Sequence, residues 1–203
     1  MIEKTLFMTS RLQPNHLGRF IAIAFFLGTL VFGFALDNYS FVSQTISEIG
    51  SMNSPFRFQF QIFKILIASL ILILSALVLK YARRNNLSMI PGILLLCFGL
   101  SDLGLALFPT PHPLHNVFGL SMTLGYLSPL FFALLWPNAA SDHFKRVSLV
   151  FFLLILIGIL LNLSPAFKPD LFPLNYYGLV QRFLVFTMFI YIAYLGKTIQ
   201  NGN

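Results

Sequence analysis

Long apolar runs separated by short polar segments are the main pattern along this chain. Six of these runs are close to the roughly 20 residues that a helix needs to cross the hydrocarbon core of a membrane. They cover residues 17–36, 60–79, 89–108, 115–136, 147–163 and 176–195. Only short loops and tails remain outside them, so the pattern predicts one six-span transmembrane domain over residues 1–203. The predicted fold class is all-α, a polytopic integral membrane bundle of six transmembrane helices.

The segment between the first two runs, residues 37–59, is too polar to cross a membrane. Within it, apolar side chains recur near helical spacing at Phe41, Val42, Ile46 and Ile49. This spacing predicts a short interfacial helix in the first outer loop. Only residues 109–114 separate the third and fourth runs, so these two spans are expected to form a tight antiparallel hairpin.

Composition supports a lipid environment and narrows the classes of partner. Hydrophobic residues make up 57% of the chain and charged residues 9%, whereas soluble domains carry about 25% charged residues. The net charge of +7 comes from basic residues at the ends of several spans, not from one cluster. Binding to nucleic acid is therefore not expected, and the expected partners are membrane lipids. The single cysteine, Cys97, lies inside an apolar run and is interpreted as a small buried side chain.

The distribution of basic residues predicts the orientation of the chain in the membrane. Nine are assigned to the side that holds both termini: Lys4, Arg11, Arg19, Lys80, Arg83, Arg84, Lys145, Arg146 and Lys197. Three are assigned to the opposite side: Arg57, Lys64 and Lys168. Basic loops tend to remain in the cytoplasm, so both termini are predicted to be cytoplasmic. The segments 37–59, 109–114 and 164–175 then face outward.

Two opposite charges are predicted to lie inside the membrane at similar depth. Asp102 precedes Pro109 by seven residues, which places it about 10 Å below the turn. Arg182 follows Tyr176 by six residues, which gives a depth of about 9 Å. Intramembrane charges are costly and are usually paired or functional, so Asp102 and Arg182 are predicted to pair directly or through water. Such a pair serves either a functional pocket or the architecture alone.

Several residue types suited to catalysis gather at the outward-facing surface. Glu48 has the chemistry of a general base or a metal ligand, and Ser43 and Ser47 lie beside it in the sequence. A serine nucleophile needs an adjacent base, and His115 is the candidate. The alternative is that residues 43–50 form a capped interfacial turn whose hydroxyls satisfy backbone amides. No Gly-x-Ser-x-Gly motif of the serine hydrolases is present in the chain.

Histidines and carboxylates also offer the ligands of a divalent metal such as zinc. His112, His115 and Asp102 are the candidate ligands, and imidazole and carboxylate groups bind this metal well. Their spacing matches no zinc signature. The alternative is that His112 is a solvated loop residue and that His115 caps the fourth span.

Candidate ligand-binding side chains lie on the fourth and sixth spans. If the fourth span begins at His115, Gly119, Met122 and Tyr126 share one helical face that suits a lipid tail. Helix packing through the glycine explains the same pattern. Near Arg182, the side chains of Tyr176 and Gln181 would complete a polar pocket, although tyrosine is also a common interfacial anchor.

Two stretches carry a family resemblance: YSFVSQTISEIGSMNSPF at residues 39–56 and GLSDLGLALFPTPHPLHNVFG at residues 99–119. They resemble a bacterial and archaeal membrane family catalogued as domain of unknown function 998. Its members have a Ser-x-x-x-Ser-Glu-x-Gly-like segment after the first span and an acid followed by Phe-Pro and a histidine further on. The matching positions here are Ser43, Ser47, Glu48, Gly50, Asp102, Phe108, Pro109 and His115. The resemblance implies a six-span fold in a prokaryotic inner membrane and a shared residue cluster, but no activity.

Three hypotheses about function follow from these residues. The first is a membrane-embedded hydrolase of a lipid or lipid-linked substrate, in which Glu48 and His115 carry out acid–base chemistry, Asp102 supports them and Arg182 binds an anionic head group. The second is a non-catalytic lipid-binding or transport protein whose pocket is gated by Asp102 and Arg182. The third is a structural membrane subunit.

Overall fold

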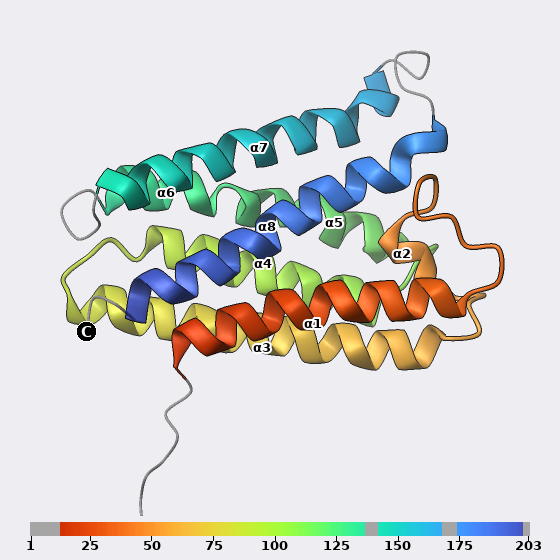
Figure 1. Ribbon diagram of the computed structural model, residues 1–203, viewed down its shortest axis with the longest axis horizontal. Coiled ribbons are helices and arrows are strands. Elements are labelled where there is room, and N and C mark those ends of the chain that lie inside the picture. Colours follow the sequence, from red (N-terminus) through yellow and green to blue (C-terminus); the bar gives the residue numbers. More distant parts are fainter. Residues whose placement is uncertain (1–12, 137–141, 168–173, 201–203) are drawn as a thin grey trace, which may run out of the picture.

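The fold is a bundle of long helices, seen here in a computed structural model that describes residues 13–136, 142–167 and 174–200 (Figure 1). Every regular element within these ranges is a helix. The long helices are α1 (Pro14–Ala35), α3 (Arg57–Arg84), α4 (Ile90–Leu107), α5 (Pro113–Tyr126), α6 (Ser128–Leu135), α7 (Asp142–Phe167) and α8 (Tyr177–Gln200). The short elements are α2 (Ile46–Ile49) and the 3₁₀ turn η2 (Leu174–Tyr176).

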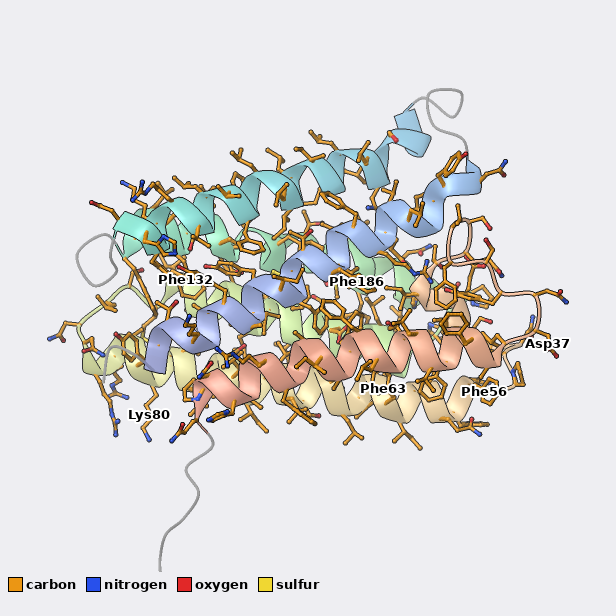
Figure 2. The ribbon with its side chains drawn as sticks, in the orientation of Figure 1. Asp37, Phe56, Phe63, Lys80, Phe132 and Phe186 are labelled. Carbon is orange, nitrogen blue, oxygen red and sulfur yellow. The ribbon has the colours of Figure 1, made fainter. Side chains whose placement is uncertain are left out.

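Six helical segments are long and apolar enough to cross a membrane, with α5 and α6 together forming the fourth. The predicted all-α fold with six transmembrane helices is therefore confirmed, and the chain is an integral membrane protein. Large apolar side chains such as Phe34 and Leu160 are exposed on the outside of the bundle, as expected for surfaces that face lipid. Lys80 and Asp37 lie at opposite ends of the bundle (Figure 2).

The fourth span is divided in two, which the pattern of apolar residues does not predict. Helix α5 ends at Tyr126, and α6 begins at Ser128 with Pro129 in its first turn. Proline has no backbone N–H and its ring clashes with the preceding turn, so a continuous helix through this position would lose a hydrogen bond. The proline is instead placed at a helix start, where a missing N–H costs little.

The order of the helices around the bundle determines which side chains can meet. Helix α4 packs between α3 and α5, whereas α8 packs against α1 and α7 (Figure 1). The contact between α1 and α8 is close, because a Cβ atom added at Gly18 would lie 2.7 Å from the carbonyl oxygen of Ile192. The largest side chains of the interior are aromatic and include Phe25, Phe98 and Tyr191.

Candidate functional site

The connection between α1 and α3 (residues 36–56) folds over one end of the bundle. Its short helix α2 begins with a capping box, in which the backbone N–H and the hydroxyl of Thr45 donate to Glu48 Oε1 at 3.0 and 2.9 Å. The segment is therefore a capped turn, as the alternative interpretation held, but the carboxylate of Glu48 satisfies the Thr45 amide in place of a hydroxyl. A short helix is present as predicted, but Ile46 and Ile49 are buried, so α2 packs into the bundle as well as bordering the interface.

Arg182 holds this connection against the start of α8. It is 7% exposed, and its Nη1 donates to three backbone carbonyls, those of Phe41 at 2.7 Å, Gln44 at 2.6 Å and Gly178 at 3.0 Å. Its Nη2 donates to the hydroxyl of Tyr39. The guanidinium fork suits this task because it presents several donors in fixed directions.

Further hydrogen bonds tie the same two segments together. The backbone N–H of Leu179 donates to the carbonyl of Val42 at 3.0 Å, and that of Ile46 donates to Gln181 Oε1 at 2.7 Å. The chain approaches α8 so closely that any side chain at Gly178 would collide with the backbone of Gln44. Residues 36–56 are thus fixed to α8 by both side-chain and backbone contacts.

Tyr39 joins this network from the first turn of the connection. Its hydroxyl donates to the carbonyl of Thr45 at 2.7 Å and accepts from Arg182. Burial raises the pKa of Tyr39 above its ordinary value, although the neighbouring guanidinium works in the opposite direction. The phenol therefore remains a neutral donor at physiological pH.

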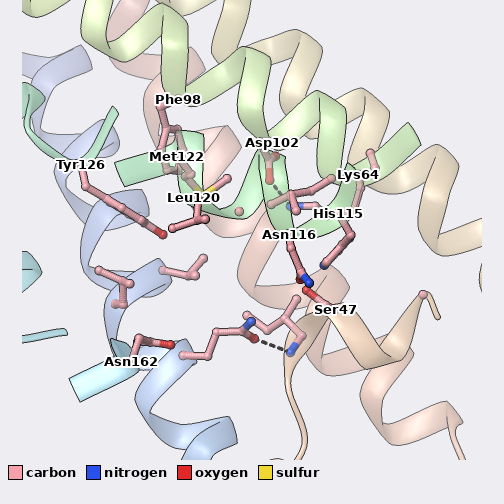
Figure 3. Close-up of a pocket in the computed structure, with 18 of the residues that line it drawn as sticks. Ser47, Lys64, Phe98, Asp102, His115, Asn116, Leu120, Met122, Tyr126 and Asn162 are labelled. Carbon is pink, nitrogen blue, oxygen red and sulfur yellow. Dashed lines mark hydrogen bonds and ion pairs between the residues drawn. The ribbon is translucent and has the colours of Figure 1, made fainter. Parts of the chain in front are cut away.

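The predicted pairing of Asp102 with Arg182 is wrong. The carboxylate of Asp102 forms an ion pair with Lys64 of α3 (Figure 3). The reason is the helix order, since α4 lies beside α3 and the side chain of Arg182 is directed at residues 36–56. From the sequence alone, Lys64 serves only to assign the orientation of the chain. Its position within the predicted second span is a signal that it lies in the membrane.

The ion pair is buried and incompletely satisfied. The side chain of Lys64 is 11% exposed and that of Asp102 is 3% exposed. The ammonium also lies 4.9 Å from the centroid of the Phe25 ring, a cation–π contact. Asp102 Oδ2 is buried and has no hydrogen-bond partner in the structure.

A cavity of about 840 Å³ opens beside this ion pair (Figure 3). Its polar end is lined by Ser47, Gln61, Lys64, Asp102, His115 and Asn116. The rest of the wall is mainly apolar and includes Leu105, Met122, Ile159, Leu163, Leu184 and Val185. The side chains of Asn116 and Ser47 point toward each other across the polar end (Figure 3).

The two histidines have different structural roles. His112 is the N-cap of α5, since its Nδ1 accepts from the backbone N–H of Leu114 at 3.2 Å. The expectation that His115 caps this span is therefore wrong. His115 Nδ1 lies 2.8 Å from the carbonyl oxygen of Phe108, and because a carbonyl can only accept, this nitrogen is the donor. His115 Nε2 is then the acceptor of the neutral ring.

The proposed zinc ligands do not form a cluster. Among the residues that the structure describes, no three histidine, cysteine, aspartate or glutamate side chains are placed to hold a metal ion together. His112 is engaged as a helix cap, whereas Asp102 forms an ion pair with Lys64. The prediction of a metal site at His112, His115 and Asp102 is therefore not supported by the geometry of these side chains.

The other predicted site residues divide between the cavity and its surroundings. Ser47, Tyr126 and Gln181 line the cavity together with Asp102 and His115. Four predicted residues lie outside its described lining: Ser43, Glu48, Tyr176 and Arg182. Sequence reasoning missed five polar lining residues, Gln61, Lys64, Asn116, Thr123 and Asn162. Their positions as scattered polar residues within apolar runs were the available signal for them.

A family comparison covers almost all of this architecture. The model of a family described as protein of unknown function (DUF998) matches residues 20–197. The chain belongs to the DUF998 family. The resemblance noted in the two polar stretches of the sequence is thus confirmed. No curated protein and no solved structure matches the chain.

The cavity of this DUF998 protein is bordered by α2 at one end. It is also open on one side, between α5 and α7. Asn116, Gly119, Leu120 and Thr123 of α5 all line the cavity and are also exposed at the surface of the bundle. A Cβ atom added at Gly119 would meet no atom within 4 Å. Leu163 of α7 is likewise both lining and exposed. We call this gap between α5 and α7 the lateral opening.

Proposed function

We propose that this DUF998 protein binds an amphipathic, lipid-like molecule in its cavity. The observation that carries the proposal is the division of the cavity wall, which has a polar end around the Lys64–Asp102 ion pair and a larger apolar part. The volume of about 840 Å³ falls within the range of about 300–1,000 Å³ that is usual for small-molecule sites. A head group would contact the polar end, and an acyl or alkyl chain would contact the apolar part.

Aromatic packing at the inner end of the cavity supports binding over transport. The rings of Phe25 and Phe189 stack with centroids 3.8 Å apart, and those of Phe98 and Tyr126 lie 5.4 Å apart. We call these four side chains the aromatic floor. A transported solute would need a polar path through this layer, and the packed rings offer none. This geometry favours a ligand that enters and leaves from the same half of the bundle.

The lateral opening supports entry from the bilayer. Because it lies between two membrane-spanning helices, an amphipathic molecule could enter without first leaving the lipid phase. With both termini in the cytoplasm of a prokaryotic inner membrane, as the basic residues indicate, the cavity would open toward the outer leaflet. The ligand would then be drawn from that leaflet.

The Gly119→Trp variant tests this proposal. An indole at this position would fill the lateral opening without disturbing helix packing, because the added Cβ has open space around it. We expect native mass spectrometry of the purified variant to show loss of most lipid that co-purifies with the parent protein.

Val117→Trp is the matched control, since Val117 is on the same helix and exposed but outside the described cavity lining. It should retain the lipid of the parent protein. Equal lipid occupancy in the parent protein and both variants, or no lipid and no uptake of added lipid in any of them, would contradict the proposal.

A second candidate function is hydrolysis of an ester-containing amphiphile, and the hydrogen bond of His115 favours it. With Nδ1 donating to the Phe108 carbonyl, Nε2 is available as a general base in the cavity. Ser47 lines the same cavity and supplies a hydroxyl. Glu48 no longer belongs to this candidate mechanism, because its carboxylate caps α2.

The hydrolase candidate predicts that purified protein releases fatty acid from a monoacylglycerol and that His115→Ala reduces the rate by about two to four orders of magnitude. Glu48→Gln should retain the activity, because this carboxylate serves the capping box. Fatty acid release would be followed by mass spectrometry. No release by the parent protein, or equal release by His115→Ala, would exclude His115-dependent hydrolysis of this substrate class.

A further inference from the structure

An unsatisfied carboxylate oxygen marks the polar end of the cavity. Asp102 is 2% exposed, and its Oδ2 has no hydrogen-bond partner in the structure. Leaving a buried acceptor unpaired is costly, and native proteins rarely do so without a reason. Asp102 also lines the cavity. Neighbouring atoms cover this oxygen in the structure, so a ligand group that donates a hydrogen bond would satisfy it once they shift aside.

The charges around the cavity favour an uncharged head group. Its described lining contains one basic side chain, Lys64, and one acidic side chain, Asp102, and these form an ion pair. His115 adds no charge in its neutral form. A charged head group placed against this largely buried ion pair would bring a third charge beside it with no counter-ion, which is costly where water is excluded.

The hydrogen-bonding groups at this end favour hydroxyls in particular. Asp102 Oδ2 lacks a donor and His115 Nε2 can accept from one, whereas Lys64 and the amides of Gln61 and Asn116 offer donors of their own. A hydroxyl both donates and accepts, so it can satisfy the two kinds of partner at once. A hydrocarbon would satisfy neither kind.

We propose that the ligand of this cavity is an uncharged, hydroxyl-bearing amphiphile of the monoacylglycerol or long-chain alcohol type. One hydroxyl donates to Asp102 Oδ2 and accepts from Lys64. The hydrocarbon chain of the ligand lies against Met122 and Leu184 above the aromatic floor. A hydrocarbon chain longer than the cavity extends through the lateral opening. This assignment rests on the proposed binding of an amphiphile and adds the class of its head group.

Three probes that have the same type of hydrocarbon chain and differ in their head groups test this assignment. Monoolein is an uncharged diol, oleate is anionic and oleylamine is cationic at neutral pH. Binding to delipidated protein in detergent would be measured for each by native mass spectrometry. We expect monoolein to bind at least about tenfold more tightly than either charged probe, the effect of roughly one good hydrogen bond or one unpaired charge.

Charge variants should change this preference in opposite directions. Asp102→Asn leaves Lys64 without its anion and should shift the preference to oleate, whereas Lys64→Gln leaves Asp102 without its cation and should shift it to oleylamine. Asp37→Asn is the matched control, because Asp37 is an exposed acid outside the cavity lining. It should keep the preference of the parent protein.

A double variant keeps the test decisive if a single variant fails to fold. Lys64→Met/Asp102→Leu removes both charges, and replacing a buried ion pair by apolar groups of similar volume is often neutral or stabilising. It should fold and lose at least about tenfold in monoolein affinity. Unchanged affinity would overturn the assigned head-group contacts.

The outcomes for the parent protein separate the two proposals. Binding of oleate or oleylamine as tightly as monoolein would overturn the head-group class and leave the amphiphile-binding proposal standing. Failure of all three probes to bind would overturn both proposals.

Discussion

At the scale of single residues, two cations that are largely shielded from solvent have distinct tasks. Arg182 donates to backbone carbonyls and to a tyrosine, so it organises residues 36–56. Lys64 pairs with Asp102 at the cavity wall. A guanidinium suits the first task because of its several fixed donors, and an ammonium suits the second as a compact charge. The position of each cation in a span predicts burial, but its partner depends on the helices beside it.

The role of Arg182 predicts the result of its removal. Arg182→Gln should lower the free energy of unfolding by about 2 kcal/mol, because the part-buried carbonyls of Phe41 and Gln44 lose charged donors. It should also make residues 36–56 more susceptible to protease. Thermal unfolding in detergent and limited proteolysis would measure the two effects.

Arg19→Gln is the matched control for this change, since Arg19 is an exposed residue of α1. It should unfold at the temperature of the parent protein. A variant at position 182 with parental stability and parental protease resistance would show that the hydrogen bonds to residues 36–56 contribute little.

At the scale of elements, the sequence correctly predicts the features that depend only on residues close together in the chain. The six spans follow from the length of their apolar runs, and the capped turn follows from Thr45 and Glu48 being three residues apart. The division of the fourth span also depends on a single local residue. Pro129 was the available signal that the helix is interrupted there.

The candidate site could be predicted only in part, because it depends on the order of helices around the bundle. Depth in the membrane correctly made Asp102 an intramembrane group, but two cations, Lys64 and Arg182, had similar depths. Helix α4 packs beside α3, and this neighbour relation decides in favour of Lys64. No periodicity in a single sequence contains that information. The same limit explains why Asn116 was overlooked.

At the scale of the whole molecule, the two ends of the bundle differ in both charge and shape. Exposed basic residues gather at one end on α3, α7 and α8, as at Arg83, Lys145 and Lys197. The cavity and residues 36–56 lie toward the other end, as the position of α2 opposite the C-terminal end of α8 indicates (Figure 1). The positive-inside rule therefore couples the orientation of the protein to the leaflet that would supply the proposed ligand.

Cysteine accessibility would test this orientation. The chain has one native cysteine, Cys97 of α4, so a Cys97→Ala background leaves no other thiol. In that background, Asn53→Cys places a thiol on the exposed connection between α1 and α3, and Asn85→Cys places one at the exposed end of α3. A membrane-impermeant maleimide applied to intact cells should label position 53 and should label position 85 only after permeabilisation. The reverse pattern would place the cavity toward the cytoplasm, and the inner leaflet would then be the source of the amphiphile.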